Sequence, residues 1–410
     1  MLFVPSIPLW VIYSIFFLEF FIASFFVFSF IQSKFSKKIL LGKPEFDITF
    51  VIPAYNKESL LEGCVKSIKN LDYAQNRIKI FIVDDKSTDN TLEVARKLEK
   101  KYSGISVFAK PKNTGKADTL NFGIKRASTE IVAVLDADTL PQGDILQKSL
   151  PKFLDSNIMA VACRFKPSNH SRAIERMQYV EYFLTGFYRS IMSHMGALPV
   201  APAFTIFRRE FFVKHGYFDK GNMTEDFEMG LRIQSKRGNI GYIADTYAAT
   251  DVPDTLRKFI RQRLRWGYGT LYNCRKYLDM FFNPKYGDLA FFILPTWLFG
   301  TLLVSVVLLF TLYLLFAQIV NFAIKLSAGW LPYFTFNLTR FILFFTDLRV
   351  LLVIFSLLIG LSLFLFIRIE FREKIKLKDY ILYIFLYLWI QAVASTMAVG
   401  YFLAGKKPKW

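Results

Sequence analysis

The stretch VAVLDADTLPQGD, residues 132–144, places two carboxylates one residue apart, directly after an apolar run and before a turn that contains Pro and Gly. Residues two apart on an extended strand point to the same side, so Asp136 and Asp138 share one face. Two aligned carboxylates repel each other, and a bound Mg²⁺ or Mn²⁺ explains the pair most economically because both ions prefer oxygen ligands. The competing interpretation is an ordinary turn or helix cap, where isolated aspartates are common.

The residues before this stretch alternate short β-branched apolar runs with amphipathic segments, a pattern typical of a parallel α/β sheet. We predict strands near 48–56, 78–85, 104–109 and 130–138, and helices near 60–71, 91–102 and 117–128. Three of these strands end in polar residues at Tyr55, at Asp84 and Asp85, and at Asp136. The carboxyl ends of strands in open α/β sheets converge on one crevice, so we expect these loops to share a site.

Long apolar runs lie at both ends of the chain. Of its 410 residues 53% are hydrophobic, and the surplus lies in residues 9–31 and in runs that begin near 289, 350 and 381. Each run is about 20 residues or longer, enough to cross a bilayer. We therefore predict a transmembrane anchor in 1–33, a C-terminal transmembrane region of about three spans in 286–404, and a basic tail in 405–410.

The charges that flank the apolar runs predict their orientation. Lys34, Lys37, Lys38 and Lys43 follow the first run with no acid before Glu45, which by the positive-inside rule places the following domain in the cytoplasm. Four simple spans cannot keep both the basic loop 368–378 and the basic tail inside. A partial crossing near 330–345 would change this balance, and the side of the C-terminus stays open.

The net charge of +19 suits anionic lipid headgroups or a phosphorylated substrate. A nucleic-acid partner is not expected for a chain flanked by membrane spans. The three cysteines lack metal-site or disulfide spacing, so we interpret them as reduced packing residues.

Two further segments carry possible chemistry. Thr224, Glu225 and Asp226 precede a helical pattern, where capping alone could explain them. Residues 256–277 hold seven basic residues and no acid, with apolar residues at helical spacing, so we predict an amphipathic interfacial helix within 256–285. Gly267 and Gly269 interrupt it, which indicates a bend or a close approach of another backbone.

Four motifs thus stand in order: VDD at 83–85, DAD at 136–138, TED at 224–226 and QRLRW at 262–266. The series resembles the membrane-embedded family 2 glycosyltransferases, which include cellulose, chitin, hyaluronan and poly-N-acetylglucosamine synthases. The resemblance implies a GT-A fold with a Rossmann-like, mostly parallel sheet in 42–255. It also implies a nucleotide-sugar donor, a divalent metal and inversion at the anomeric carbon.

The resemblance also implies roles for single residues at the nucleotide. Tyr55 would stack on uracil, and Asp85 would bind the edge of the base with support from Asp84. Lys116 would lie near the phosphates, where an ammonium group suits them.

Asp136 and Asp138 match the nucleotide-diphosphate and metal motif, with Asp138 the firmer metal ligand. Asp226 matches the general base, and Glu225 beside it joins the catalytic candidates. Because an ordinary Asp is ionised at pH 7, Asp226 needs position more than a changed pKa.

Gln262, Arg265 and Trp266 match the QxxRW element, in which the arginine contacts the diphosphate and the tryptophan packs at the acceptor sugar. Residues 199–212, PVAPAFTIFRREFF, occupy the place of a loop that lines the acceptor site, although their opening is atypical. Arg265, Lys116 and the metal would together stabilise the leaving diphosphate.

The function predicted from these residues is processive polysaccharide synthesis from a cytoplasmic UDP-sugar, coupled to export through the membrane. The alternatives are transfer of one sugar to a membrane lipid, as in ceramide glucosyltransferases, and a non-catalytic sugar-binding or export partner. Four helices would form a narrow channel unless subunits associate, which keeps the lipid alternative open, and whether a partner subunit or a homo-oligomer completes the channel stays open.

Overall fold

The computed structural model describes residues 9–35, 42, 44–329, 348–371 and 375–408. The chain forms two compact units, each described here by itself: one comprises Met1–Ser36 and Leu302–Ile375, and the other Lys37–Thr301 and Lys376–Trp410. The second unit, called the catalytic unit below, contains every motif named above. The partial crossing predicted near 330–345 lies outside the described residues.

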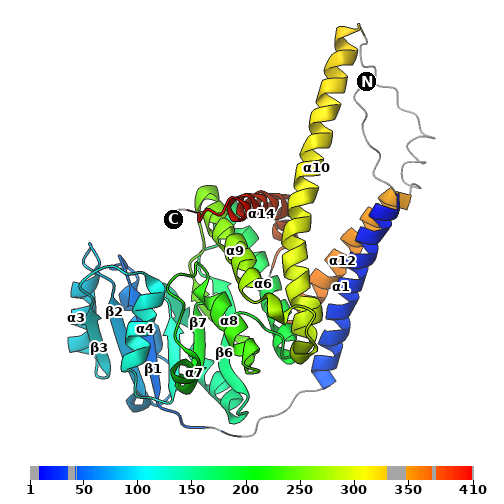
Figure 1. Cartoon of the computed structure of the whole chain (residues 1–410). Helices are drawn as coiled ribbons and strands as arrows, with labels where there is room; N and C mark the ends of the chain where they lie inside the picture. The colour runs from blue at the N-terminus through cyan, green and yellow to red at the C-terminus, as the bar shows by residue number, and fades with distance from the viewer. Residues whose placement is uncertain (1–8, 36–41, 43, 330–347, 372–374, 409–410) are drawn as a thin grey trace. The chain divides into compact units, whose positions relative to one another are not determined.

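An eight-stranded sheet forms the centre of the catalytic unit within the described residues, in the order β3-β2-β1-β4-β7-β6-β8-β5 (Figure 1). After β1 the chain adds β2 and β3 on one side, and β4 then returns to the other side of β1. This reversal creates a crevice at the carboxyl ends of β1 and β4, where open α/β sheets bind ligands. The strands are β1 (Ile48–Ala54), β2 (Ile78–Asp84), β3 (Ile105–Ala109), β4 (Ile131–Leu135), β5 (Thr139–Pro141), β6 (Ile158–Pro167), β7 (Phe204–Arg208) and β8 (Asn239–Thr250).

Helices cover both faces of the sheet, which explains the continuous apolar runs in its strands. Phe50 and Ile52 of β1 belong to a buried core that includes Leu61 of the first covering helix. Val51, on the opposite face, packs so closely against Gly123 that a Cβ there would stand 2.4 Å from it. The helices of this part are α2 (Leu61–Lys69), α3 (Thr91–Lys101), α4 (Lys116–Arg126), α5 (Ile145–Ser149), α6 (Ala173–His194), α7 (Arg209–His215) and α8 (Glu225–Ser235).

The predicted α/β fold is confirmed, and the four strands and three helices expected up to residue 138 are all present. The sheet is mixed, because only four of the seven strand pairs in the described residues are parallel. Strand β7 starts beside the end of β4, where Phe204 pairs with Leu135, and so runs antiparallel to it. This direction follows because the loop that leads into β7 reaches the crevice at Val200, Pro202 and Ala203, directly before the strand starts.

Helix α9 (Leu256–Lys276) carries the QxxRW element, and it runs without a break through both glycines. A Cβ on Gly269 would stand 2.2 Å from Thr224 Oγ1, and one on Gly267 would stand 3.0 Å from Ala398 Cβ. Of the two explanations for these glycines, the close approach of another segment is therefore confirmed. The apolar stripe expected to meet lipid is instead buried at Leu264 and Tyr268, against α14 (Leu388–Leu403).

The other unit consists of α1 (Leu9–Phe35), α12 (Leu348–Glu370) and the greater part of α10 (Leu294–Ser327), and α1 packs on α12. Among the described residues, two helical stretches are long and apolar enough to cross a membrane, Leu289–Ser327 and Leu377–Leu403. The second contains α13 (Leu377–Leu382) and α14. Shorter apolar helices at Phe16–Gln32 and Val350–Leu365 fall where the sequence predicts two further spans.

Candidate active site

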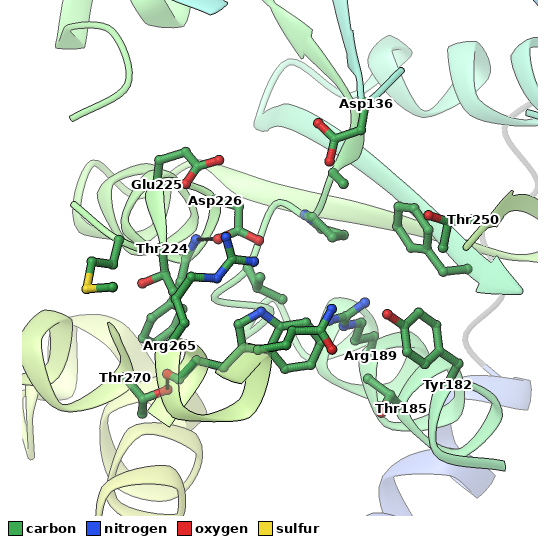
Figure 2. A pocket seen from close by; sticks show the side chains of 18 of the residues that line it. Asp136, Tyr182, Thr185, Arg189, Thr224, Glu225, Asp226, Thr250, Arg265 and Thr270 are labelled. Carbon is green, nitrogen blue, oxygen red and sulfur yellow. Dashed lines mark hydrogen bonds between the residues drawn. The ribbon is translucent and has the colours of Figure 1, made fainter. Parts of the chain in front are cut away.

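A cavity of about 400 Å³ lies at the crevice of the sheet. Figure 2 shows side chains from the sheet, from the start of α8, from α6 and from α9 around it. Three of the four sequence motifs contribute to this one cavity although they are far apart in the chain. The predicted site residues that line it are Lys116, Asp136, Asp138, Glu225, Asp226, Gln262, Arg265 and Trp266.

The two carboxylates of the opening stretch follow β4 and are each paired with a lysine. Lys116 Nζ lies 2.7 Å from Asp136 Oδ1, and Lys57 Nζ lies 2.7 Å from Asp138 Oδ2. Lys116 is the first residue of α4, whereas Lys57 follows β1. The wall of the cavity thus already attracts cationic groups, as expected of two aligned carboxylates.

Burial and neighbouring charges alter the acid–base behaviour of this wall. Burial raises the pKa of Asp136, and Asp138 raises it further, although Lys116 acts in the opposite direction. For Lys116, burial alone would lower the pKa, but the attraction of Asp136 and Glu225 outweighs it and the pKa is raised. Lys116 is therefore a permanent positive charge beside the carboxylates at neutral pH.

The oxygen ligands at this wall fit a divalent cation. Asp136 and Asp138 offer carboxylate oxygens to the same cavity, and their side chains are each about a quarter exposed. No group of three or more potential metal-ligating residues is present in the described part of the chain. Two carboxylates are nevertheless a typical protein contribution to a Mg²⁺ site whose remaining ligands are water and phosphate oxygens.

The TED motif does more than begin a helix. Thr224 stands at the N-cap of α8, but its side chain caps nothing. Thr224 Oγ1 instead accepts a hydrogen bond of 3.0 Å from Asn273 Nδ2 on α9. Asp226 faces the cavity in the first turn of α8, and Phe227 N donates to Asp226 Oδ1 at 2.8 Å, which fixes the carboxylate (Figure 2).

Helix α9 brings the QxxRW element to the opposite wall, where Gln262, Arg265 and Trp266 line the cavity. Arg263 lies between them in sequence but points away, is fully buried and forms an ion pair with Glu181 of α6. Its guanidinium also lies 4.1 Å from the ring centre of Trp266. Such cation–π contact holds the indole in a defined orientation.

The remaining predicted residues lie outside the set that lines the cavity. Tyr55 is 46% exposed at the end of β1, whereas Asp84 and Asp85 are buried. Asp85 accepts hydrogen bonds from Lys110 Nζ at 2.7 Å and from Gly115 N at 2.8 Å. It thereby fixes the loop that presents Lys116, so its predicted contact with a base stays a prediction.

Several cavity residues were not predicted from the sequence. Tyr182, Thr185 and Arg189 share one face of α6, at spacings of three and four, and this face could have been recognised as polar positions in an apolar helix. The segment 199–212, predicted as an acceptor loop, contributes Val200, Pro202 and Ala203. Tyr242 of β8 and Trp297 of α10 also line the cavity, but no motif near them in the sequence indicates a site.

The comparisons with known proteins agree with this site. Residues 44–269, more than half of the chain, match the family described as "Glycosyltransferase like family 2". The poly-beta-1,6-N-acetyl-D-glucosamine synthase of Staphylococcus aureus (strain COL) is 32% identical over 225 residues, 54% of each chain. The protein of the same name from Staphylococcus epidermidis is 30% identical over 264 residues, 63% of each chain. The chain thus matches between half and two thirds of the length of these relatives.

A solved structure is similar over nearly the whole chain. The mannosyltransferase PcManGT from Pyrobaculum calidifontis, in complex with GDP-Man and Mn²⁺, superposes with a TM-score of 0.64 and 19% identity, covering 97% of this chain and 98% of that one. At this identity the similarity concerns the fold. The family match, the fold and the ordered motifs lead to one conclusion: the chain belongs to the family 2 glycosyltransferases and has their GT-A fold.

Proposed function

We propose that this protein is a membrane-bound, inverting glycosyltransferase that uses a UDP-sugar and extends a polysaccharide. The observation that carries the proposal is the meeting of the DAD, TED and QxxRW side chains around one cavity. The relatives named as poly-N-acetylglucosamine synthases support a polymeric product and make UDP-N-acetylglucosamine the first donor to test. The apolar helical stretches and the lysines that follow the first apolar run support a location in the cell membrane, with the catalytic domain in the cytoplasm.

Asp226 would act as the general base. A sugar hydroxyl is a weak nucleophile at neutral pH, so a carboxylate within hydrogen-bond reach must remove its proton as the new bond to C1 forms. Asp226 lines the cavity, and the hydrogen bond from Phe227 N to Oδ1 fixes its carboxylate there. Attack from the side opposite to the leaving diphosphate inverts the anomeric centre, and no covalent enzyme intermediate is needed.

Asp136 and Asp138 would hold a divalent cation, Mg²⁺ or Mn²⁺, which neutralises charge on the diphosphate. Lys116 lies beside Asp136 and Glu225, with Nζ 3.4 Å from Glu225 Oε1. When phosphate oxygens enter the cavity, Lys116 can donate to them without losing its charge. Arg265 supplies a second cationic group from the opposite wall, so developing negative charge is stabilised from both sides.

Trp266 would form the surface on which the acceptor sugar packs. Aromatic rings bind the apolar faces of sugars, and Arg263 fixes this ring from behind. Gln262 lies on the same helix and has a buried side-chain oxygen, Oε1, with no hydrogen-bond partner among the described residues. An acceptor hydroxyl would satisfy this oxygen.

The test is a panel of UDP-sugars scored for UDP release by the purified protein in lipid nanodiscs, followed by sizing of the product. A polymer or a ladder of products supports the proposal. A single labelled lipid would assign the chain to lipid glycosylation instead. Absence of UDP release with every donor, metal and acceptor would leave a sugar-binding or export role.

A further inference from the structure

The cavity contains a cationic side chain, Arg189 of α6, to which the proposed reaction gives no role. Arg189 shares one face of its helix with Tyr182 and Thr185, because residues three or four apart in a helix are neighbours. Figure 2 shows Arg189 and Tyr182 pointing toward the cavity from this face. The cations of the proposed reaction, Lys116 and Arg265, lie on α4 and α9, so Arg189 belongs to a third wall.

The carboxylates that line the cavity are engaged by groups other than Arg189. Those of the DAD and TED motifs are held by lysines and by a backbone amide, as described above. Glu181 of α6 is paired with the buried Arg263, and Asp251 accepts a hydrogen bond from Ser168. Within the described residues, the Arg189 side chain makes no ion pair and no hydrogen bond. Its guanidinium is therefore available to a ligand.

A second polar group without a partner lies beside this face of α6. Tyr242 of β8 lines the cavity and is only 7% exposed, and its hydroxyl has no hydrogen-bond partner among the described residues. A Cβ on Gly186, which lies between Thr185 and Arg189 in α6, would stand 3.4 Å from this hydroxyl. Burial raises the pKa of Tyr242, although Arg189 acts in the opposite direction, so the phenol keeps its proton at neutral pH. The wall next to Arg189 thus holds a hydrogen-bond donor in reserve.

The chemistry of this wall selects an oxygen anion as its ligand. A guanidinium has only donors, and the hydroxyls of Tyr182 and Thr185 can donate as well. Burial raises the pKa of Tyr182, which keeps this phenol protonated too. A planar guanidinium binds a phosphate or a carboxylate through two parallel hydrogen bonds that are strengthened by charge. The three side chains of α6 therefore match a phosphate or a carboxylate group.

This wall lies on the acceptor side of the cavity. The proposed reaction already gives the donor diphosphate a metal ion and two basic side chains from other walls. Glu181, about two turns before Arg189 in α6, pairs with Arg263, and Arg263 lies against Trp266, the proposed surface for the acceptor sugar. Helix α6 is thereby tied to the part of α9 that would carry the acceptor.

We propose that the acceptor carries an anionic group, a phosphate or a carboxylate, and that Arg189, Tyr182 and Thr185 bind it. The inference rests on the proposed function, because the anion belongs to the acceptor of that sugar transfer. It adds a requirement for charge that the family and the motifs do not state. The anion could belong to an acidic sugar, to a sugar phosphate or to a lipid phosphate, and the test separates these sources.

Matched pairs of acceptors test the requirement for charge. With the donor that gives the most UDP release, N-acetylglucosamine 1-phosphate is compared with methyl N-acetylglucosaminide, methyl glucuronide with methyl glucoside, and decyl phosphate with decanol. In at least one pair, the wild-type protein should use the anionic acceptor with a kcat/KM roughly tenfold or more above that of its neutral partner. The pair that shows this preference identifies the source of the anion. Equal kcat/KM values within every pair would overturn the proposal.

Substitutions of Arg189 show whether this residue causes the preference. Arg189→Gln should raise the KM for the anionic acceptor by roughly 10- to 100-fold and leave the KM for its neutral partner unchanged. Arg189→Lys should keep part of the preference, because it keeps the charge and loses the paired hydrogen bonds. Arg257→Gln removes an exposed arginine outside the cavity and should behave as the wild type. Weaker UDP binding by Arg189→Gln with an unchanged acceptor preference would assign Arg189 to the donor and overturn the proposal.

Equilibrium binding separates this inference from the proposed function. Calorimetry with the protein in nanodiscs, in the presence of UDP and Mn²⁺, measures how tightly each member of the acceptor pairs binds. Tighter binding of an anionic probe that is lost in Arg189→Gln supports the anionic subsite even where no UDP is released, a result that would reject only the transferase proposal. Equal binding of the anionic and neutral probes would overturn the subsite whatever the turnover.

Discussion

We predict that Gly269→Ala disturbs this site sterically, because it adds one methyl group between α9 and the TED motif. The new Cβ would stand 2.2 Å from Thr224 Oγ1 and 2.4 Å from Thr224 Cγ2, whereas ordinary contact begins at 3.4 Å. The helix or the motif must therefore retreat by about 1 Å. Thr224 directly precedes the two catalytic candidates of α8, so this movement changes the distance between Asp226 and Arg265.

A displacement of this size has different effects on activity and on stability. Misplacing catalytic groups by about 1 Å can cost roughly 100-fold in rate, and we expect a loss of kcat of that order. Overpacking lowers the free energy of unfolding by about 1–3 kcal/mol. Ala has a higher helix propensity than Gly, which offsets roughly 1 kcal/mol of this loss. The variant should thus fold, with a modestly lower Tm, and transfer sugar very slowly.

The assay is UDP release in nanodiscs together with thermal unfolding by intrinsic fluorescence. Gly400→Ala is the matched control, since this helical glycine has no atom within 4 Å of its added Cβ, and it should keep wild-type activity. UDP binding should survive in the Gly269→Ala variant because the nucleotide side of the cavity is untouched. If Gly269→Ala retains wild-type turnover and Tm, the close contact between α9 and the TED motif does not position the catalytic groups.

Three further changes address the nucleotide side of the site. Asp138→Ala, or chelation of divalent metal, should weaken UDP binding at least tenfold by calorimetry, and added Mn²⁺ or Mg²⁺ should restore binding only to the chelated wild type. Lys116→Gln removes a charge that lowers the pKa of Asp136, so protons should compete with the metal for Asp136 at higher pH. In a pH titration of metal-dependent UDP binding, the pH below which binding is lost should therefore rise. An unchanged pH would show that Lys116 does not influence the metal-binding carboxylate. Asp85→Asn weakens the buried ion pair with Lys110 and should lower the free energy of unfolding, measured by chemical denaturation, by about 2 kcal/mol, whereas the exposed Glu62→Gln should leave it unchanged within error.

Much of the nucleotide-binding half could be predicted from the sequence because its signals are local. Each strand up to residue 138 is an apolar run bounded by polar residues, and the rule that strand ends converge places Asp136 correctly at the cavity, whereas Tyr55, Asp84 and Asp85 lie outside the set that lines it. The antiparallel strands in this mostly parallel sheet could not be located from the sequence. The direction of β7 depends on where the preceding loop lies in the folded chain. No periodic pattern in the sequence reports this position.

The acceptor half was harder to predict, since its residues come from helices that meet only in the folded chain. The two glycines of α9 indicated either a bend or a close approach of another segment, and the residues that approach, Thr224 and Ala398, could not be identified from spacing. Likewise the apolar stripe of α9 gave the correct helix, while α14 rather than lipid covers much of it. Amphipathic periodicity shows that a face is buried and does not show what buries it.

The proposed reaction depends on Asp226, which would remove the proton of the acceptor hydroxyl in a cavity where donor and acceptor meet. The measurement that tests it most directly is the turnover of Asp226→Asn with UDP-N-acetylglucosamine, with UDP binding measured on the same preparation. We expect transfer to fall by at least 1,000-fold, on the order of the effect of removing a general base, while UDP binding stays close to that of the wild type. Full turnover by Asp226→Asn would contradict it.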